Sequence, residues 1–177
     1  PTTPRPTHRE CDVAAGQTPF VWGPQGFSPP TTNFAQLDAQ NDRFVLVFDP
    51  STNWSALFEA VLARNYSGNG LTLTIIWAAA TATSGDVVWD VCIERQQDGT
   101  DVVTSDSFAA VQSVTATAPG VAATYKYSTV AFTAGAQMDS LAAGEAFCLK
   151  VTRNAASGSD TMAGNAWIRK LELRETP

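Results

Sequence analysis

Apolar and polar residues alternate with a period of two along most of the chain after residue 43. The clearest runs are residues 71–77, 87–93 and 147–151, in which every second residue is a large apolar one. This alternation is typical of β-strands that bury one face. We therefore predict strands at these three places. Their inward faces would form a core that includes Trp77 and Trp89.

Several other stretches are also interpreted as strands, and Gly, Asp, Ser and Pro turns separate them. Residues 55–65 fit either a helix or a strand, and we favour a strand because strands flank them. Residues 139–144 resemble one helical turn, with an Asp cap and a Gly stop. The remaining predicted strands are 44–48, one within 101–117, 121–133 and a last one that places Trp167, Leu171 and Leu173 in the core.

About eight strands with regular turns predict an all-β fold. We expect a two-sheet antiparallel β-sandwich, jelly-roll-like rather than a barrel, spanning residues 44–177 as one domain. Before it, residues 1–43 contain seven of the ten prolines. Proline fixes φ and removes a hydrogen-bond donor, so this segment is expected to be an extended N-terminal arm.

Large apolar side chains are interspersed through the arm, and they need a surface to cover. We expect them to contact another subunit, because an extended segment can add to a sheet edge of a neighbour. Trp54, which lies in a predicted loop, is grouped with them. The candidate partner-binding residues are Phe20, Trp22, Phe27, Phe34 and Trp54.

The charge balance argues against one class of partner. The chain has 11 basic and 17 acidic residues, a formal net charge of −6. Binding nucleic acid needs clustered Lys and Arg, so no nucleic-acid partner is expected. No apolar run approaches the roughly 20 residues that cross a bilayer, so no membrane partner is expected either.

The residues that carry chemistry are few and scattered. One histidine, His8, lies in the arm, so a Ser-His-Asp or Cys-His arrangement is not expected. Asp90 and Glu94 would lie on one strand face about 13 Å apart, too far for a glycosidase pair. We expect Asp98 and Asp101 to belong to a tight hairpin turn. The sequence therefore predicts no enzyme.

The cysteines also lack a functional spacing. Cys11, Cys92 and Cys148 contain no CxxC pair, and we expect free buried thiols. A disulfide between Cys92 and Cys148 is the alternative. Zinc needs four ligands, and His8 with Cys11 offers only two. We therefore expect no metal ion and no cofactor.

Five segments, taken in order, resemble small structural proteins of tailed bacteriophages. The resemblance covers about residues 54–175 and is a whole-domain pattern rather than a catalytic motif. The segments are Gly70–Trp77, Ala82–Val91, Asp106–Phe108, Asp139–Phe147 and Asp160–Ala166.

This resemblance implies a jelly-roll capsid decoration (cement) protein on the outer surface of the phage head. Its partners would be the major capsid protein and further copies of itself, with a trimer suiting local three-fold points of the shell. The main alternative is a receptor- or glycan-binding β-sandwich module of a tail or fibre. A carbohydrate-binding module of a secreted enzyme and a depolymerase are further alternatives.

Overall fold

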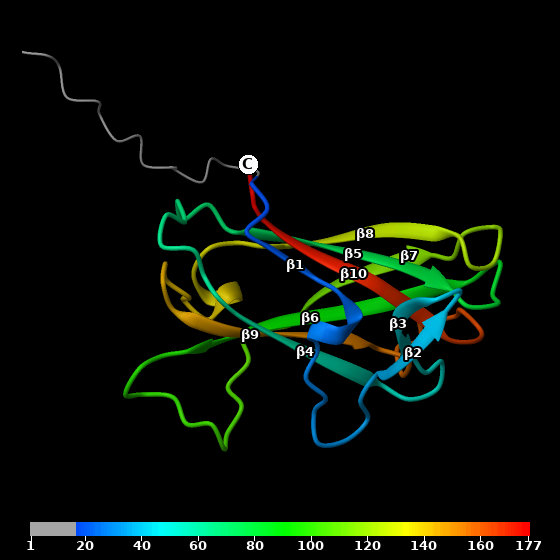
Figure 1. The fold of residues 1–177 in the computed structure, drawn as a ribbon, viewed down its shortest axis with the longest axis horizontal. Helices are drawn as coiled ribbons and strands as arrows, with labels where there is room; N and C mark the ends of the chain where they lie inside the picture. Colours follow the sequence, from blue (N-terminus) through cyan, green and yellow to red (C-terminus); the bar gives the residue numbers. More distant parts are fainter. Residues whose placement is uncertain (1–16) are drawn as a thin grey trace, which may run out of the picture.

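The computed structural model describes residues 17–177, which fold into two antiparallel sheets that face each other across one core (Figure 1). The six-stranded sheet has the order β2-β3-β10-β5-β8, and β1 also pairs with β10. The four-stranded sheet has the order β4-β9-β6-β7. The predicted two-sheet, jelly-roll-like sandwich is therefore confirmed, with ten strands among the described residues rather than about eight.

After residue 43 the strands lie within or close to the predicted segments, whereas β1 and β2 lie in the segment predicted to be an arm. The six-stranded sheet contains β1 (Phe20–Trp22), β2 (Gln36–Gln40), β3 (Arg43–Phe48), β5 (Leu71–Ala79), β8 (Tyr125–Phe132) and β10 (Ala166–Glu175). The four-stranded sheet contains β4 (Trp54–Val61), β6 (Asp86–Gln96), β7 (Gln112–Thr117) and β9 (Ala146–Arg153). Two 3-10 turns, η1 (Pro24–Gly26) and η2 (Ala136–Met138), complete the described elements. Within residues 17–177, no helix has the length and hydrophobicity of a membrane-spanning segment.

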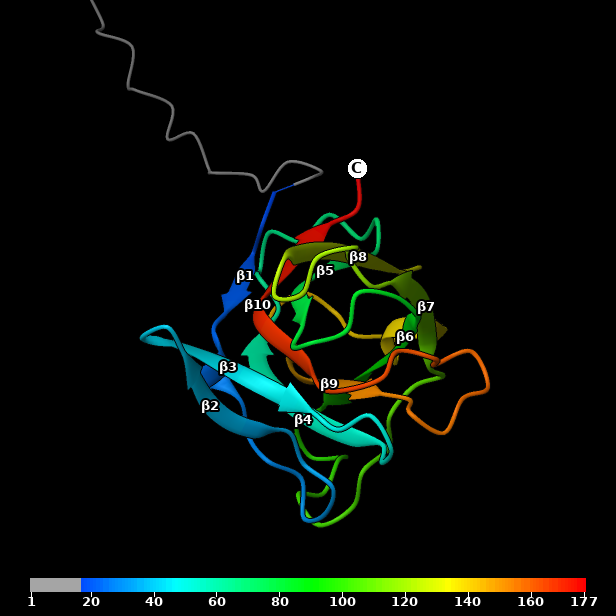
Figure 2. The same cartoon turned by 90° about the vertical axis from the view of Figure 1, so that its right-hand side faces the viewer.

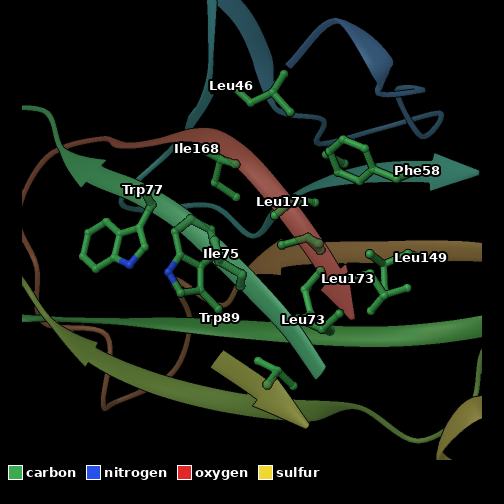
Figure 3. Packing of buried hydrophobic residues seen from close by; sticks show 14 of the residues in the cluster. Leu46, Phe58, Leu73, Ile75, Trp77, Trp89, Leu149, Ile168, Leu171 and Leu173 are labelled. Atoms are coloured by element: carbon green, nitrogen blue, oxygen red, sulfur yellow. The ribbon is translucent and has the colours of Figure 1, made fainter. Parts of the chain in front are cut away.

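Two tryptophans, one from each sheet, pack against each other in the core (Figure 3). Trp77 and Trp89 are both fully buried, and their rings meet edge to face with centroids 5.9 Å apart. The Trp77 indole N–H donates to the hydroxyl of Ser128 at 2.9 Å, so its polar group is satisfied. The predicted core positions of these two tryptophans are confirmed.

Trp167 does not share that position. The pairing of β10 with β5 shifts register between Ile168 and Lys170, which marks a β-bulge. Ala166 and Ile168 face the core before the bulge, whereas Leu171 and Leu173 face it afterwards. Trp167 therefore lies on the other face and is half-buried. The prediction of Trp167 in the core was wrong, because the bulge adds one residue to β10 and so changes which residues of the strand face the core.

The described part of the expected arm, residues 17–43, belongs to the sandwich. Phe20–Trp22 pairs with Leu171–Leu173 of β10, and Gln36–Gln40 pairs with Arg43–Val47 of β3. Between these strands, Ser28 forms an isolated bridge with Leu57 of β4. The boundary expected at residue 43 is thus not a structural boundary. The many prolines of residues 1–43 predict an arm. Residues 20–22 and 36–40 of this segment instead form strands that pair with β10 and β3.

The turn at residues 139–144 also differs from the prediction. A 3-10 turn, Ala136–Met138, comes just before it, and Asp139 follows with a left-handed φ of 53°. The Asp139 carboxylate accepts a hydrogen bond from the backbone N–H of Arg95 at 3.0 Å rather than capping a helix. Residues 55–65, in contrast, form the predicted strand over Trp54–Val61.

Candidate functional site

A cleft lies on the outer face of the four-stranded sheet, away from the core. Its floor is formed by β4, β6 and β9, and the loop of residues 97–111, here called the cover loop, extends over it. In Figure 1 the cover loop and the loop of residues 28–34 both project beyond this sheet on the same side, and Figure 2 agrees. The cleft has a volume of about 670 Å³, which is large enough for a short oligomeric ligand.

Strand register places the floor residues side by side. Cys148 of β9 pairs with Glu59 of β4 on one side and with Glu94 of β6 on the other. The next row is formed in the same way by Leu57, Lys150 and Cys92. Side chains two residues apart on a strand share a face, so both rows point out of the same side of the sheet.

The cover loop is fastened to the floor through Glu94. This side chain is nine-tenths buried, and its Oε1 accepts hydrogen bonds from the backbone N–H and the hydroxyl of Ser107. A backbone bond from Ala109 to Ile93, at 2.9 Å, holds the same end of the loop. At the other end, the Asp101 carboxylate accepts from the backbone N–H of Gln97 at 2.6 Å. The loop is therefore positioned by its own polar residues.

The cleft contains an aromatic ring and several apolar groups. Phe108 lines it, and the Lys150 ammonium lies 5.2 Å from the centroid of that ring. This distance allows a cation–π contact that orients both side chains. Val102 and Val103 lie on the loop and are exposed by 61% and 105%, so the rim of the cleft presents apolar surface to solvent.

Negative charge predominates around the cleft. Five carboxylates line it, against one guanidinium from Arg95, whose Nε is buried with no hydrogen-bond partner in the described part of the chain. The ion pair found within residues 17–177 lies elsewhere, so no cation within ion-pair distance neutralises these acids. The carboxylates belong to Glu59, Glu94, Asp98, Asp101 and Asp106.

The pKa values of the two thiols on the cleft floor, Cys92 and Cys148, depend on burial and on the nearby charges. Burial, with a smaller effect of the nearby carboxylates of Glu59, Glu94 and Asp106, raises the pKa of Cys148 to about 12. Burial likewise raises the pKa of Cys92 to about 11, although Lys150 opposes the shift. Both thiols are free and buried, as predicted, and the third cysteine of that prediction, Cys11, lies outside the described residues. The alternative prediction, a disulfide between Cys92 and Cys148, is wrong. Cys92 lies directly opposite Lys150, so Cys148, two residues before Lys150 on β9, is only a diagonal neighbour of Cys92.

A polar row continues the floor beyond the cleft. The Ser55 and Thr152 hydroxyls share a hydrogen bond of 2.7 Å. Asp90 accepts from the Ser113 hydroxyl at 2.5 Å and from the Asn154 amide at 2.8 Å. These hydrogen bonds fix the side chains in place, so this end of the face offers preorganised polar groups.

The predicted partner-binding residues are not part of the cleft. Phe20, Trp22, Phe27 and Trp54 are partly buried and pack against the protein's own core. Phe34 is 37% exposed and bridges to Ser55 at the edge of β4, beside the polar row. Phe34 therefore differs from the other four residues, whose apolar side chains already pack against the core of the same chain.

The cleft residues were not singled out from the sequence. In the sequence, Glu94, Asp98 and Asp101 are only scattered acids, and a tight hairpin turn is predicted at Asp98. The connection between β6 and β7 is instead the whole cover loop, residues 97–111. Its length was the available signal, because long loops without secondary structure are often functional. Glu59 and Phe108 carried no such signal.

The cleft has no arrangement for metal binding. Within residues 17–177, no group of three or more His, Cys, Asp or Glu side chains is placed to hold a metal ion. The acids are spread over two strands and a loop, and Glu94 and Asp101 already accept hydrogen bonds from the chain. The groups present are suited to hydrogen bonding and charge interaction with a ligand.

No protein-family model matches this sequence, and no curated protein matches it. Among solved structures, the chain is similar to the CBM22-1 xylan-binding domain of Paenibacillus barcinonensis Xyn10C, with a TM-score of 0.50, 9% identity, and coverage of 90% of this chain and 95% of that chain. It is also similar to the CBM22-1-CBM22-2 tandem domain of the same protein, with a TM-score of 0.50, 14% identity, and coverage of 94% and 51%. At these identities the likeness shows a shared fold.

Proposed function

We propose that this chain is a non-catalytic glycan-binding module that holds a carbohydrate chain in the cleft beneath the cover loop. The observation that carries the proposal is the cleft of about 670 Å³ on the outer face of one sheet, lined by polar groups and an aromatic ring. The fold supports it, because the solved structure with the same architecture is a xylan-binding domain.

The chemistry of the cleft suits a sugar. A sugar ring presents hydroxyls that donate and accept hydrogen bonds and C–H faces that are apolar. Carboxylates such as Glu59 accept from hydroxyls, whereas Arg95 and Gln96 donate to them. Phe108 and Leu57 offer apolar contact to the C–H faces.

Binding is favoured over hydrolysis by the placement of the acids. Glu59 and Glu94 flank β9, so their backbones lie about 10 Å apart at the usual strand spacing. Retaining glycosidases place their two carboxyl groups about 5–5.5 Å apart and inverting ones about 6.5–9.5 Å apart, both less than the separation of these two backbones. Glu94 is also engaged by Ser107, which would have to be displaced before that carboxylate acted on a substrate.

The capsid decoration hypothesis stays a prediction, as do the trimer, the capsid partner and the location on a phage head. The binding role expected of the arm in that hypothesis needs free apolar side chains. Phe20, Trp22 and Phe27 are instead packed against the core of the same chain. The glycan-binding alternative needs no such arm, and for that reason we prefer it.

Affinity gel electrophoresis of the full chain against neutral soluble polysaccharides, with xylan first, tests the proposal. Phe108→Ala should weaken binding about tenfold, which corresponds to about 1.4 kcal/mol for one aromatic contact. Glu59→Gln should weaken it as well, because the amide loses the charged acceptor. The matched control is Tyr127→Ala, which removes a ring that is 64% exposed on the other sheet.

Retardation by a polysaccharide that falls with Phe108→Ala but not with Tyr127→Ala supports the cleft as the site. Absence of retardation by every polysaccharide tested would reject glycan binding. Retardation that falls only with Tyr127→Ala would place a glycan site on the six-stranded sheet instead. Release of reducing ends from a bound polysaccharide would reject the non-catalytic part of the proposal.

A further inference from the structure

We infer that the cleft prefers a glycan that carries positive charge, namely an oligosaccharide of amino sugars with free, protonated amines. This inference rests on the proposed function and names the ligand class for the same site. It follows from the charges that face the cleft and from the lack of an ion pair to them within residues 17–177.

The charged groups facing the cleft are mostly acidic when all contributing elements are taken together. β4 contributes Glu59, β6 contributes Glu94 and Arg95, and β9 contributes Lys150. The cover loop adds three further carboxylates and no cation, and the sequences of β7 and of residues 28–34 contain no charged residue. With both cations counted, the site still has an excess of negative charge. The three loop carboxylates are Asp98, Asp101 and Asp106.

A second observation concerns Glu94. Ser107 donates twice to Oε1 of this nine-tenths buried carboxylate. Glu94 lines the cleft, and its Oε2 is not among the buried polar atoms that lack a hydrogen bond. A carboxylate at the cleft wall can accept a charge-assisted hydrogen bond from a cationic group of a ligand. A protonated amine on a sugar ring is such a donor.

The two cations at the cleft, Lys150 and Arg95, do not neutralise its carboxylates. Lys150 is directed to the Phe108 ring, and neither it nor Arg95 forms an ion pair with a cleft carboxylate. Burial is the main reason that the pKa of Cys148 is raised, and the carboxylates of Glu59, Glu94 and Asp106 add to the shift. A polyuronate or sulfated glycan would be repelled by these carboxylates, whereas an amine gains attraction without losing the hydroxyl contacts.

A pair of oligosaccharides with one backbone tests the inference. Glucosamine hexamer carries free amines, and N-acetylglucosamine hexamer has the same linkage with each amine blocked. Calorimetry with the full chain at about pH 6, where amines are protonated, should give at least about tenfold tighter binding of the glucosamine hexamer. Raising the salt from about 0.01 M to about 0.5 M should remove most of that preference.

Two variants assign the preference to the cleft. The double variant Glu59→Gln/Asp106→Asn should reduce the preference to below about threefold, because it removes two charges while keeping the side-chain shapes. Asp42→Asn, a carboxylate in the β2–β3 turn, should leave it unchanged. Oligolysine is included as a cation without a sugar ring.

The outcomes separate this inference from the proposed function. Equal or tighter binding of the N-acetylated hexamer, or tighter binding of oligolysine than of either hexamer, would overturn the preference for amino sugars. The proposed function would survive that result if a neutral polysaccharide still bound in a Phe108-dependent manner. If no saccharide of any charge bound, both would be rejected.

Discussion

Arg153 and Asp160 form an ion pair enclosed within the protein: Arg153 Nη2 lies 2.7 Å from Asp160 Oδ1, and the side chains are 0% and 1% exposed. The remaining guanidinium donors reach the backbone carbonyls of Met162 and Gly164, both at 2.7 Å. Asp160 also accepts from the backbone N–H of Val88 at 3.1 Å. The pair thus fastens the β9–β10 loop to β6.

Breaking this pair should destabilise the fold strongly. Asp160→Asn removes the charge and leaves the Arg153 guanidinium buried without a counter-ion, which costs about 3–5 kcal/mol. Chemical denaturation of both proteins measures the difference in the free energy of unfolding. The control Asp42→Asn makes the same chemical change at an exposed turn and should stay within about 0.5 kcal/mol. Equal effects of the two substitutions would show that the pair contributes no net stability.

A second prediction concerns the segment that the sequence presents as an arm. Trp22 stacks on Phe20 with centroids 5.4 Å apart and contacts Phe58 and Phe147 at 5.9 and 6.4 Å. Trp22→Ala should therefore lower the free energy of unfolding by about 2–4 kcal/mol, a core effect reduced by partial exposure. Val21→Ala, at a side chain that is 58% exposed on the opposite face, should change it by less than about 0.5 kcal/mol.

Thermal unfolding followed by tryptophan fluorescence and by circular dichroism measures both variants. An unchanged midpoint for Trp22→Ala would mean that residues 17–43 are not part of the cooperative unit. In that case Trp22 would be available to a partner, as the sequence led us to expect. We also expect a chain that lacks residues 1–43 to unfold, because β1 and β2 leave with it and the edge of β10 loses a pairing.

The strands differ in how well they can be predicted from the sequence. Alternation identified β5, β6 and β9 because each buries one face completely, as Leu73, Val91 and Leu149 do. Short strands such as Phe20–Trp22 contain too few residues to establish a period. The bulge in β10 resets the period in mid-strand, which is why Trp167 was misplaced.

The cleft was less predictable than the fold for a physical reason. Glu59 and Glu94 are brought together only by the pairing of β4 and β6 with β9, and a strand order cannot be read from spacing along the chain. Phe108 reaches the floor because Ser107 is anchored on Glu94. Such contacts are long-range, so a single sequence contains no local pattern for them.

A third prediction tests the turn that leads into β6. Gly85 has a φ of +87°, and a Cβ at this position would lie 2.6 Å from the Thr161 carbonyl oxygen and 2.8 Å from the Cα of Met162. Both neighbours are backbone atoms that cannot move aside easily. Gly85→Ala should therefore cost at least about 2 kcal/mol, the sum of left-handed strain and steric overlap.

Gly23→Ala is the matched control for that substitution. Gly23 has an extended φ of −88°, and a Cβ there would meet nothing within 4 Å. Its stability should change little or rise slightly, because alanine restricts the unfolded chain. Denaturant midpoints compare the two variants. Equal stability of Gly85→Ala and Gly23→Ala would contradict the prediction. It would mean that the backbone at Thr161 and Met162 can move to make room for the added methyl group.

The last prediction uses the two buried thiols to report on the floor of the cleft. Burial raises the pKa of Cys92 from 9.0 to about 11 and that of Cys148 from 9.0 to about 12. At about pH 8 both should be protonated and should react with a thiol reagent far more slowly than in denatured protein, since the thiolate is the nucleophile. A Cys11→Ser background restricts the reaction to these two residues.

The same pKa values predict how stability depends on pH. A thiol whose pKa is higher in the folded state binds its proton more tightly there, so folding is favoured in full below the unfolded value of 9.0. This contribution is lost as the pH rises through about 11 and then about 12. A variant that also carries Cys92→Val and Cys148→Ala should show a shallower loss of stability over this range, because other groups titrate equally in both proteins. Parallel pH profiles, or native thiols that react as fast as denatured ones, would show that the sheet floor is more open to water than its burial indicates.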